Sequence, residues 1–132
     1  MGTEHPNVHK IREALSTYNT GDRQAMRAFL APDIRWHVSG DHALSGDYEG
    51  IDEVLAYFDE VQELTDGTLR IEPTQMLADD GRASIFMRVT GKRGDRTLDV
   101  EMAETLLLDE DGRWKEYWAL ADDQAAVDAF WS

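Results

Sequence analysis

The most informative segment of the chain reads TLDVEMAETLLL and spans residues 97–108. Successive residues of a strand point to opposite faces, so this segment presents two different rows of side chains. One row is apolar except for Glu104, and its other members are Leu98, Val100, Met102, Leu106 and Leu108. The second row is mostly polar, which is typical of a sheet face toward water. We therefore expect a long strand that covers a core on one face and carries one acid among the core residues.

Glu104 is the candidate catalytic residue, because burial disfavours the charged form of a carboxyl and raises its pKa. An acid that stays protonated near neutral pH is able to donate a proton, and a poised carboxylate is able to accept one. The structural alternative is that Glu104 lies at an opening of the sheet, or pairs with Lys115 or an arginine. Structural ion pairs also perturb acids, so both interpretations stay open.

The next strand, residues 113–120, determines which side chains lie beside Glu104. With a two- or four-residue loop ending at Gly112, the face of Glu104 also holds Lys115, Tyr117 and Ala119. Tyr117 is then the neighbour whose hydroxyl hydrogen-bonds the acid, and it is the second candidate catalytic residue. The opposite face holds Trp114, Glu116, Trp118 and Leu120. A loop of three or five residues reverses this assignment.

The first half of the chain has helical periodicity. Apolar residues at spacings of three and four predict a helix over residues 8–18, which residues 19–22 end, and Asp22 caps a short second helix. Residues 32–33 predict a turn, residues 34–38 a strand, and residues 39–50 a loop. A third helix covers residues 51–61, with Asp52 and Glu53 favourably placed in its first turn.

The second half changes to the period of strands. Residues 68–78 predict a strand interrupted at Pro73, residues 82–90 another, and residues 91–96 and 109–112 predict turns. Asp122 and Asp123 precede a closing helix over residues 124–131. Three helices followed by an antiparallel meander predict an α+β domain, with the helices packed on one side of a curved sheet.

Composition narrows the classes of function. The 132 residues suit a single domain over residues 1–132, and they include no cysteine, which excludes a thiol nucleophile and a disulfide scaffold. The formal net charge of −14 argues against binding to nucleic acid or anionic membranes. Without an apolar leader or membrane span, we expect a cytoplasmic protein.

The sequence gives little support for a catalytic histidine, a metal site, a nucleotide site or a serine nucleophile. His37 alternates with Trp36, so only one of them faces the interior; we expect Trp36 there and His37 at the sheet rim. His37 and His42 do not match a metal-ligand spacing, and no glycine-rich phosphate loop or nucleophile elbow is present. We therefore expect no metal and no cofactor. The apolar stripes predict a pocket for a small apolar ligand, lined by Tyr18, Trp36, Tyr57, Phe58, Met87, Met102, Glu104 and Tyr117.

Several local motifs resemble the SnoaL-like branch of the nuclear transport factor 2-like superfamily, which includes ketosteroid isomerases. The resemblance covers essentially the whole chain, and its matching stretches are residues 18–22, 31–38, 44–50 and 123–131. It implies a cone-shaped α+β barrel whose open end binds small molecules, commonly in a homodimer. Its members include isomerases, cyclases, epoxide hydrolases and proteins without known catalysis.

The catalytic residues of ketosteroid isomerases carry over in part. The position of their helical tyrosine holds Ala14, and the position of their base holds Val38. Their second acid matches Glu104. The epoxide hydrolase arrangement needs an arginine in the pocket, and Arg88 falls off the apolar face.

Two functions remain open from the sequence. One is a cofactor-free isomerase or cyclase-like enzyme that uses Glu104, and the other is a non-catalytic ligand-binding or dimeric scaffold module. The predicted outer row with Trp114 and Trp118 favours a homodimer through the outer face of the sheet.

Overall fold

The structure is a computed structural model, and it describes residues 4–132. Four α-helices occur in this part of the chain: α1 (Pro6–Asn19), α2 (Arg23–Met26), α3 (Ile51–Leu64) and α4 (Gln124–Trp131). A 3₁₀ turn, η1 (Arg27–Phe29), follows α2. The same residues contain six strands: β1 (Leu30–Val38), β2 (Gly46–Glu49), β3 (Arg70–Ala78), β4 (Arg82–Arg93), β5 (Arg96–Leu108) and β6 (Trp114–Ala121).

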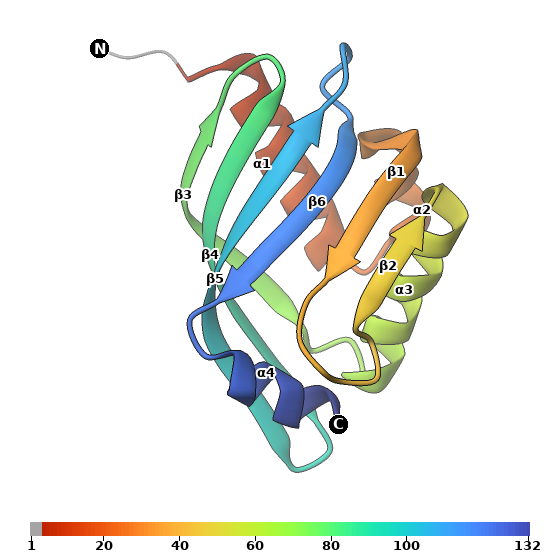
Figure 1. Cartoon of the computed structure of the whole chain (residues 1–132), viewed down its shortest axis with the longest axis vertical. Coiled ribbons are helices and arrows are strands. Elements are labelled where there is room, and N and C mark those ends of the chain that lie inside the picture. The colour runs from red at the N-terminus through yellow and green to blue at the C-terminus, as the bar shows by residue number, and fades with distance from the viewer. Residues whose placement is uncertain (1–3) are drawn as a thin grey trace.

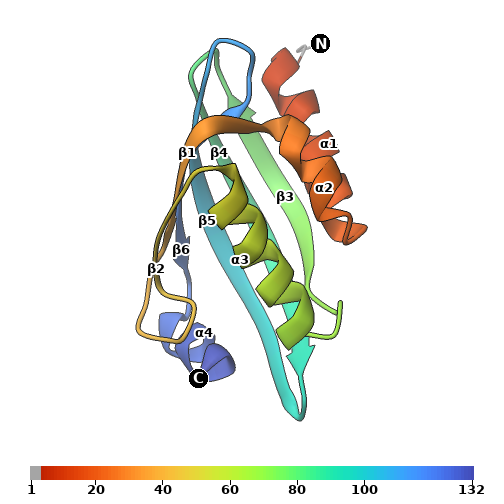
Figure 2. The same ribbon diagram turned by 90° about the vertical axis from the view of Figure 1, so that its right-hand side faces the viewer.

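The strands form one curved sheet in the order β2-β1-β6-β5-β4-β3 (Figure 1). Helices α1, α2 and α3 lie on one side of it, and α4 lies at one end (Figure 2). This arrangement confirms the predicted α+β fold. The sheet is mixed rather than antiparallel throughout, because β6 returns beside β1 in the parallel direction. Local periodicity predicts the strands, but this pair depends on contacts between distant segments.

The edge formed by β1 and β2 differs from the prediction. β1 begins at Leu30, and Pro32 and Asp33 lie within it at a shift of its register against β6. Such an irregularity tolerates a proline, which cannot donate to a regular ladder. The predicted loop over residues 39–50 also contains β2, a four-residue edge strand. A strand this short leaves too few alternating residues to be recognised.

The hairpin between β5 and β6 has one register next to its loop and the other beyond a bulge, so both predicted alternatives occur in it. Its loop has five residues, so Leu108 pairs with Trp114, and the prediction that Trp114 points outward is wrong. One extra residue, Lys115, then shifts the register, so that Leu106 pairs with Tyr117. As a result Trp114 is only 3% exposed, and Lys115 is exposed instead of sharing the face of Glu104. A β-bulge of this kind reverses the facing of side chains on its two sides.

The core lies between the concave face of the sheet and α3. Helix α3 contributes Val54, Leu55, Phe58 and Val61, all nearly inaccessible to solvent. Predicted helix caps are confirmed: the Asp22 carboxylate accepts a hydrogen bond from the Ala25 N–H at 3.1 Å, and Asp123 accepts one from Ala126 at 3.0 Å. Within residues 4–132, no helix is both long and apolar enough to cross a membrane.

Candidate functional site

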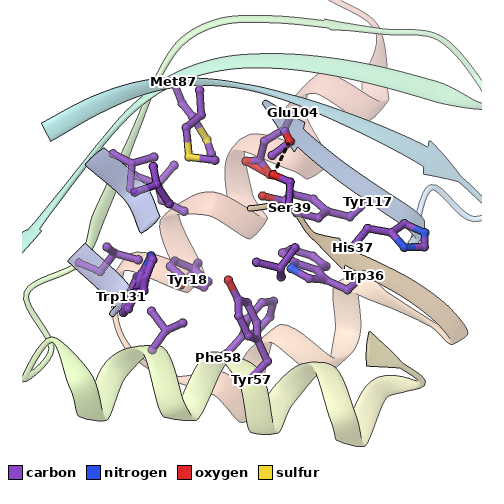
Figure 3. A pocket seen from close by; sticks show the side chains of 18 of the residues that line it. Tyr18, Trp36, His37, Ser39, Tyr57, Phe58, Met87, Glu104, Tyr117 and Trp131 are labelled. Carbon is purple, nitrogen blue, oxygen red and sulfur yellow. Dashed lines mark hydrogen bonds between the residues drawn. The ribbon is translucent and has the colours of Figure 1, made fainter. Parts of the chain in front are cut away.

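A cavity opens between the concave face of the sheet, α1, α3 and the closing helix α4 (Figure 3). It leaves about 90 Å³ for the centres of water-sized molecules. All eight residues that the sequence assigns to the pocket line this one cavity, namely Tyr18, Trp36, Tyr57, Phe58, Met87, Met102, Glu104 and Tyr117. The structure therefore brings residues from six separate elements of the chain to a single space.

Glu104 is the most unusual group in the wall. It lies on β5 and is only 3% exposed, and burial raises its pKa from 4.5 to about 8. The nearby Tyr117 hydroxyl opposes this rise by hydrogen bonding, but burial is the larger effect. Among the described residues, no group completes a hydrogen bond to Oε1 of Glu104. The carboxyl is thus held mainly protonated at neutral pH, with one oxygen free to meet a ligand.

The floor beside Glu104 is a stack of aromatic rings. Trp36 on β1 pairs in register with Tyr117 on β6, and their ring centroids are 3.6 Å apart with an angle of 8° between the planes. Phe58 of α3 meets the Trp36 ring edge-on at 5.0 Å. Trp36 is 6% exposed, and in the described part of the chain its Nε1 completes no hydrogen bond. This floor is aromatic and largely apolar, which suits an apolar ligand.

Two further tyrosines bring hydroxyl groups to the cavity. Tyr18 comes from α1 and packs edge-on against Phe58 at 5.2 Å, and Tyr57 comes from α3. Burial raises the pKa of both hydroxyls above the usual 10.0, and the charge of Glu104 raises them further. Both groups therefore stay protonated over the physiological range and are able to donate hydrogen bonds.

His37 and His42, the two histidines that we considered as metal ligands, lie in different places relative to the cavity. The His37 ring points away from the cavity (Figure 3), and its nitrogens contact Asp47 and Glu116, each at 2.7 Å. His42 lies at the mouth, where its Nδ1 accepts a hydrogen bond from the Leu44 N–H at 3.1 Å. Within residues 4–132, no three His, Cys, Asp or Glu side chains are placed to hold a metal ion.

Some wall residues were not predicted from the sequence. Ser39 and His42 belong to the loop after β1, and Gln124 and Trp131 belong to α4. The loop is tied to α4, because the Asp41 N–H donates to Asp128 at 3.1 Å. No local pattern marks a loop as part of a pocket mouth, whereas the apolar face of the closing helix is a signal that points to Trp131.

Three residues bear on the family activities considered from the sequence. Val38 lines the cavity and Ala14 is fully buried, so neither position offers an acid or a hydroxyl. Arg88 lies on the outer face and pairs with Asp99 at 2.6 Å. Among the described residues that line the cavity, Glu104 is therefore the one with a carboxyl, and none is the arginine of the epoxide hydrolase arrangement.

Known proteins share this architecture along nearly the whole chain. A family model described as a SnoaL-like domain matches residues 11–117. An uncharacterized protein of Mycobacterium tuberculosis is 28% identical over 98% of this chain and 99% of its own length. The structure of Bal32a, from a soil-derived mobile gene cassette, is 28% identical with a TM-score of 0.90, and the match covers 96% of each chain.

A more distant structure is IdmH of Streptomyces antibioticus, described as a putative polyketide cyclase. It is 17% identical with a TM-score of 0.75, and the match covers 93% of this chain and 96% of IdmH. At that identity the likeness concerns the fold. Proteins described as nuclear transport factor 2-like share the fold as well. The match to the family model spans most of the chain, and the chain therefore belongs to the SnoaL-like domain family.

Proposed function

We propose that the chain binds a small, largely apolar ligand in the cavity, and that Glu104 acts on it as a general acid or base. The reaction class is a cofactor-free proton transfer of the isomerase or cyclase kind. The observation that carries the proposal is the Glu104 carboxyl, which is buried, has a pKa of about 8 and has one unpaired oxygen. Groups with this combination in a cavity are candidates for acid and base catalysis.

The size of the cavity limits the ligand. Its volume of about 90 Å³ is of the same order as the ~150 Å³ of a cavity that holds one benzene ring. A compound of about one ring fits that space, with its face on the stack of Trp36 and Tyr117. A carbonyl oxygen directed at Glu104 would accept a hydrogen bond from the protonated carboxyl.

That contact favours removal of a proton from the carbon next to the carbonyl. Both halves of the step are possible on this one carboxyl: one oxygen gives its proton to the carbonyl oxygen, while the other takes the proton that leaves the neighbouring carbon. The donor already in place stabilises the negative charge that grows on the carbonyl oxygen. Tyr117 lies beside Glu104 and supports the same oxygen or the acid itself. The fold shared with a putative polyketide cyclase agrees with this reaction class at the level of fold alone.

A second candidate function is ligand binding without turnover. Val38 and Ala14 favour it, because each stands where a ketosteroid isomerase has a catalytic group. A single acid must then both give and take the proton, or the ligand must carry its own base. Without either, the cavity holds the ligand unchanged.

Cyclohex-3-enone provides a test of both candidates, since a shift of its double bond into conjugation changes its ultraviolet absorbance. We expect the wild-type protein to bind it and convert it. Glu104→Gln keeps the shape of the side chain, and it should lower turnover by ~10²–10⁴-fold with binding preserved. Glu101→Gln is the matched control, because Glu101 is exposed on the same strand.

Each outcome separates the candidates. Turnover that survives Glu104→Gln unchanged contradicts a catalytic role for Glu104. Binding without turnover in the wild type supports the binding module. If neither this ketone nor other one-ring ketones bind, the cavity is not the site of a small apolar ligand.

We also propose a homodimer through the outer face of the sheet. Trp114 is buried and does not contribute to this face. The exposed apolar residues on it are Leu77, Phe86, Trp118 and Leu120. Light scattering at micromolar concentration should give twice the chain mass of 15.0 kDa, and a mass near 15.0 kDa would contradict the dimer. The cytoplasmic location stays a prediction from the sequence.

A further inference from the structure

A histidine lies between two carboxylates on the outer face of the sheet, directly behind the cavity. Nδ1 of His37 is 2.7 Å from Asp47 of β2, and Nε2 is 2.7 Å from Glu116 of β6. The ring also stacks on Trp118, with centroids 5.3 Å apart and an angle of 20°. The side chains of His37 and Glu116 are 28% and 21% exposed. The contacts tie β1 to both of its neighbours in the sheet.

Both contacts require the charged form of the ring. An ionised carboxylate only accepts hydrogen bonds, and a neutral imidazole has one N–H to donate. The imidazolium has two, so it alone satisfies Asp47 and Glu116 together. Loss of the proton leaves one carboxylate facing a nitrogen lone pair, and that contact must open.

The position of this bridge connects it to the cavity. Adjacent residues of a strand point to opposite faces. His37 and Glu116 point outward, so their neighbours Trp36 and Tyr117 point inward. Trp36 and Tyr117 form the last register pair between β1 and β6 toward the mouth. The side-chain bridge therefore begins where the backbone ladder between these two strands ends.

We propose that His37 is a positioning residue: its imidazolium bridge between β2 and β6 holds Trp36 and Tyr117 in their stacked contact beside Glu104. Its effect on ligand binding rests on the function proposed above, whereas its effect on the stack does not. Without the bridge, the ends of β1 and β6 separate more easily, and the stacked rings of Trp36 and Tyr117 become less ordered.

The bridge responds to pH in a defined direction. The hydrogen bond that the ring donates to Asp47 raises the pKa of His37 most, and the one to Glu116 adds to it. Arg35, on the same strand and the same outer face, pairs in register with Glu116 and Glu49 and is the cationic neighbour. The bridge is complete below the raised pKa of His37 and is lost as the pH increases through it.

The first experiment follows the bridge without any ligand. Trp118 fluorescence, obtained as the difference from Trp118→Phe, reports the charge of the stacked His37 ring, because an imidazolium quenches indole emission. Near-ultraviolet circular dichroism, assigned with Trp36→Phe, reports the stack of Trp36 and Tyr117. Both measurements use the Glu104→Gln background, because Glu104 beside Tyr117 would otherwise add its own titration to the dichroism. In that background we expect both signals to change together as the pH increases, and the dichroism to be independent of pH once His37→Gln is added.

The second experiment measures ligand affinity in the Glu104→Gln background, which removes the titration of Glu104 itself. Cyclohex-2-enone is the probe, because it carries a carbonyl on one ring. Its affinity should fall ~10-fold across the titration of His37, and His37→Gln should bind it ~10-fold more weakly at low pH, as expected for a displaced binding surface. His9→Gln is the control, since His9 is exposed on α1.

Glu116→Gln is a second variant in case His37→Gln does not fold. It removes one acceptor charge, so the fluorescence and dichroism transitions should move together to lower pH. The inference is overturned if the dichroism of the stack ignores the charge of His37, or if His37→Gln keeps the dichroism and its pH dependence. If no ketone binds but the stack follows His37, the proposed function fails while the positioning role stands.

Discussion

Two protonation sites lie back to back on β1, β5 and β6, and the two faces of the sheet treat them in opposite ways. On the concave face, Glu104 is surrounded by apolar side chains, and burial keeps it neutral by raising its pKa. On the outer face, His37 has carboxylates on both sides, and they favour its charged form by raising its pKa. Both shifts favour the protonated form, which is a neutral hydrogen-bond donor in Glu104 and an ion-paired bridge in His37.

The comparison shows how alternation along a strand separates chemistry from support. Trp36 and Tyr117 face the ligand space, while the adjacent His37 and Glu116 face outward and link the same strands. A change on the outer row therefore acts on the inner row through the backbone.

The largest effect concerns Glu104 and pH. Its folded pKa of about 8 is above its unfolded value of 4.5, so the folded state binds the proton more tightly. The contribution of Glu104 to the free energy of unfolding is then fully present below pH 4.5 and is lost as the pH increases toward and through 8. The decrease amounts to at most ~5 kcal/mol. Urea unfolding at several pH values should show that Glu104→Gln lacks this contribution, and identical pH profiles would contradict it.

The next effect contrasts two tryptophans on opposite faces. Trp36→Ala should lower the free energy of unfolding by ~3–5 kcal/mol, because it leaves a cavity in the aromatic stack. Trp118→Ala should cost less than ~1.5 kcal/mol, since Trp118 is already 39% exposed. Chemical denaturation of both variants checks the difference. Equal losses would show that the outer face is as tightly packed as the cavity floor.

The smallest effect concerns the ion pair between Arg88 and Asp99 on the outer face. The two side chains are 51% and 58% exposed, so water and salt weaken their attraction. Arg88→Gln should leave both the stability and the turnover of any verified substrate within experimental error. A clear loss of turnover would assign Arg88 a role that its outward position does not explain.

Much of the cavity was predictable because it depends on strand alternation. The row with Glu104, the placement of Tyr117 and the inward direction of Trp36 all follow from period-two patterns. Features that depend on geometry between strands were not predictable. Lys115 is an extra residue in β6, and it changes the face to which Trp114 points. No sequence pattern indicates this extra residue. The same holds for β2 and for the bridge at His37, since Asp47 and Glu116 are distant from it in the chain.

The most direct test of the central claim is the titration of the Glu104 carboxyl by carbon-13 nuclear magnetic resonance, with Glu104→Gln used to assign the signal. The account predicts a midpoint near pH 8, so that the group is mainly protonated at pH 7. A bound one-ring ketone that accepts a hydrogen bond from the acid should move the midpoint higher. A midpoint at or below the ordinary value of 4.5 would contradict the account, because Glu104 would then be a charged structural carboxylate.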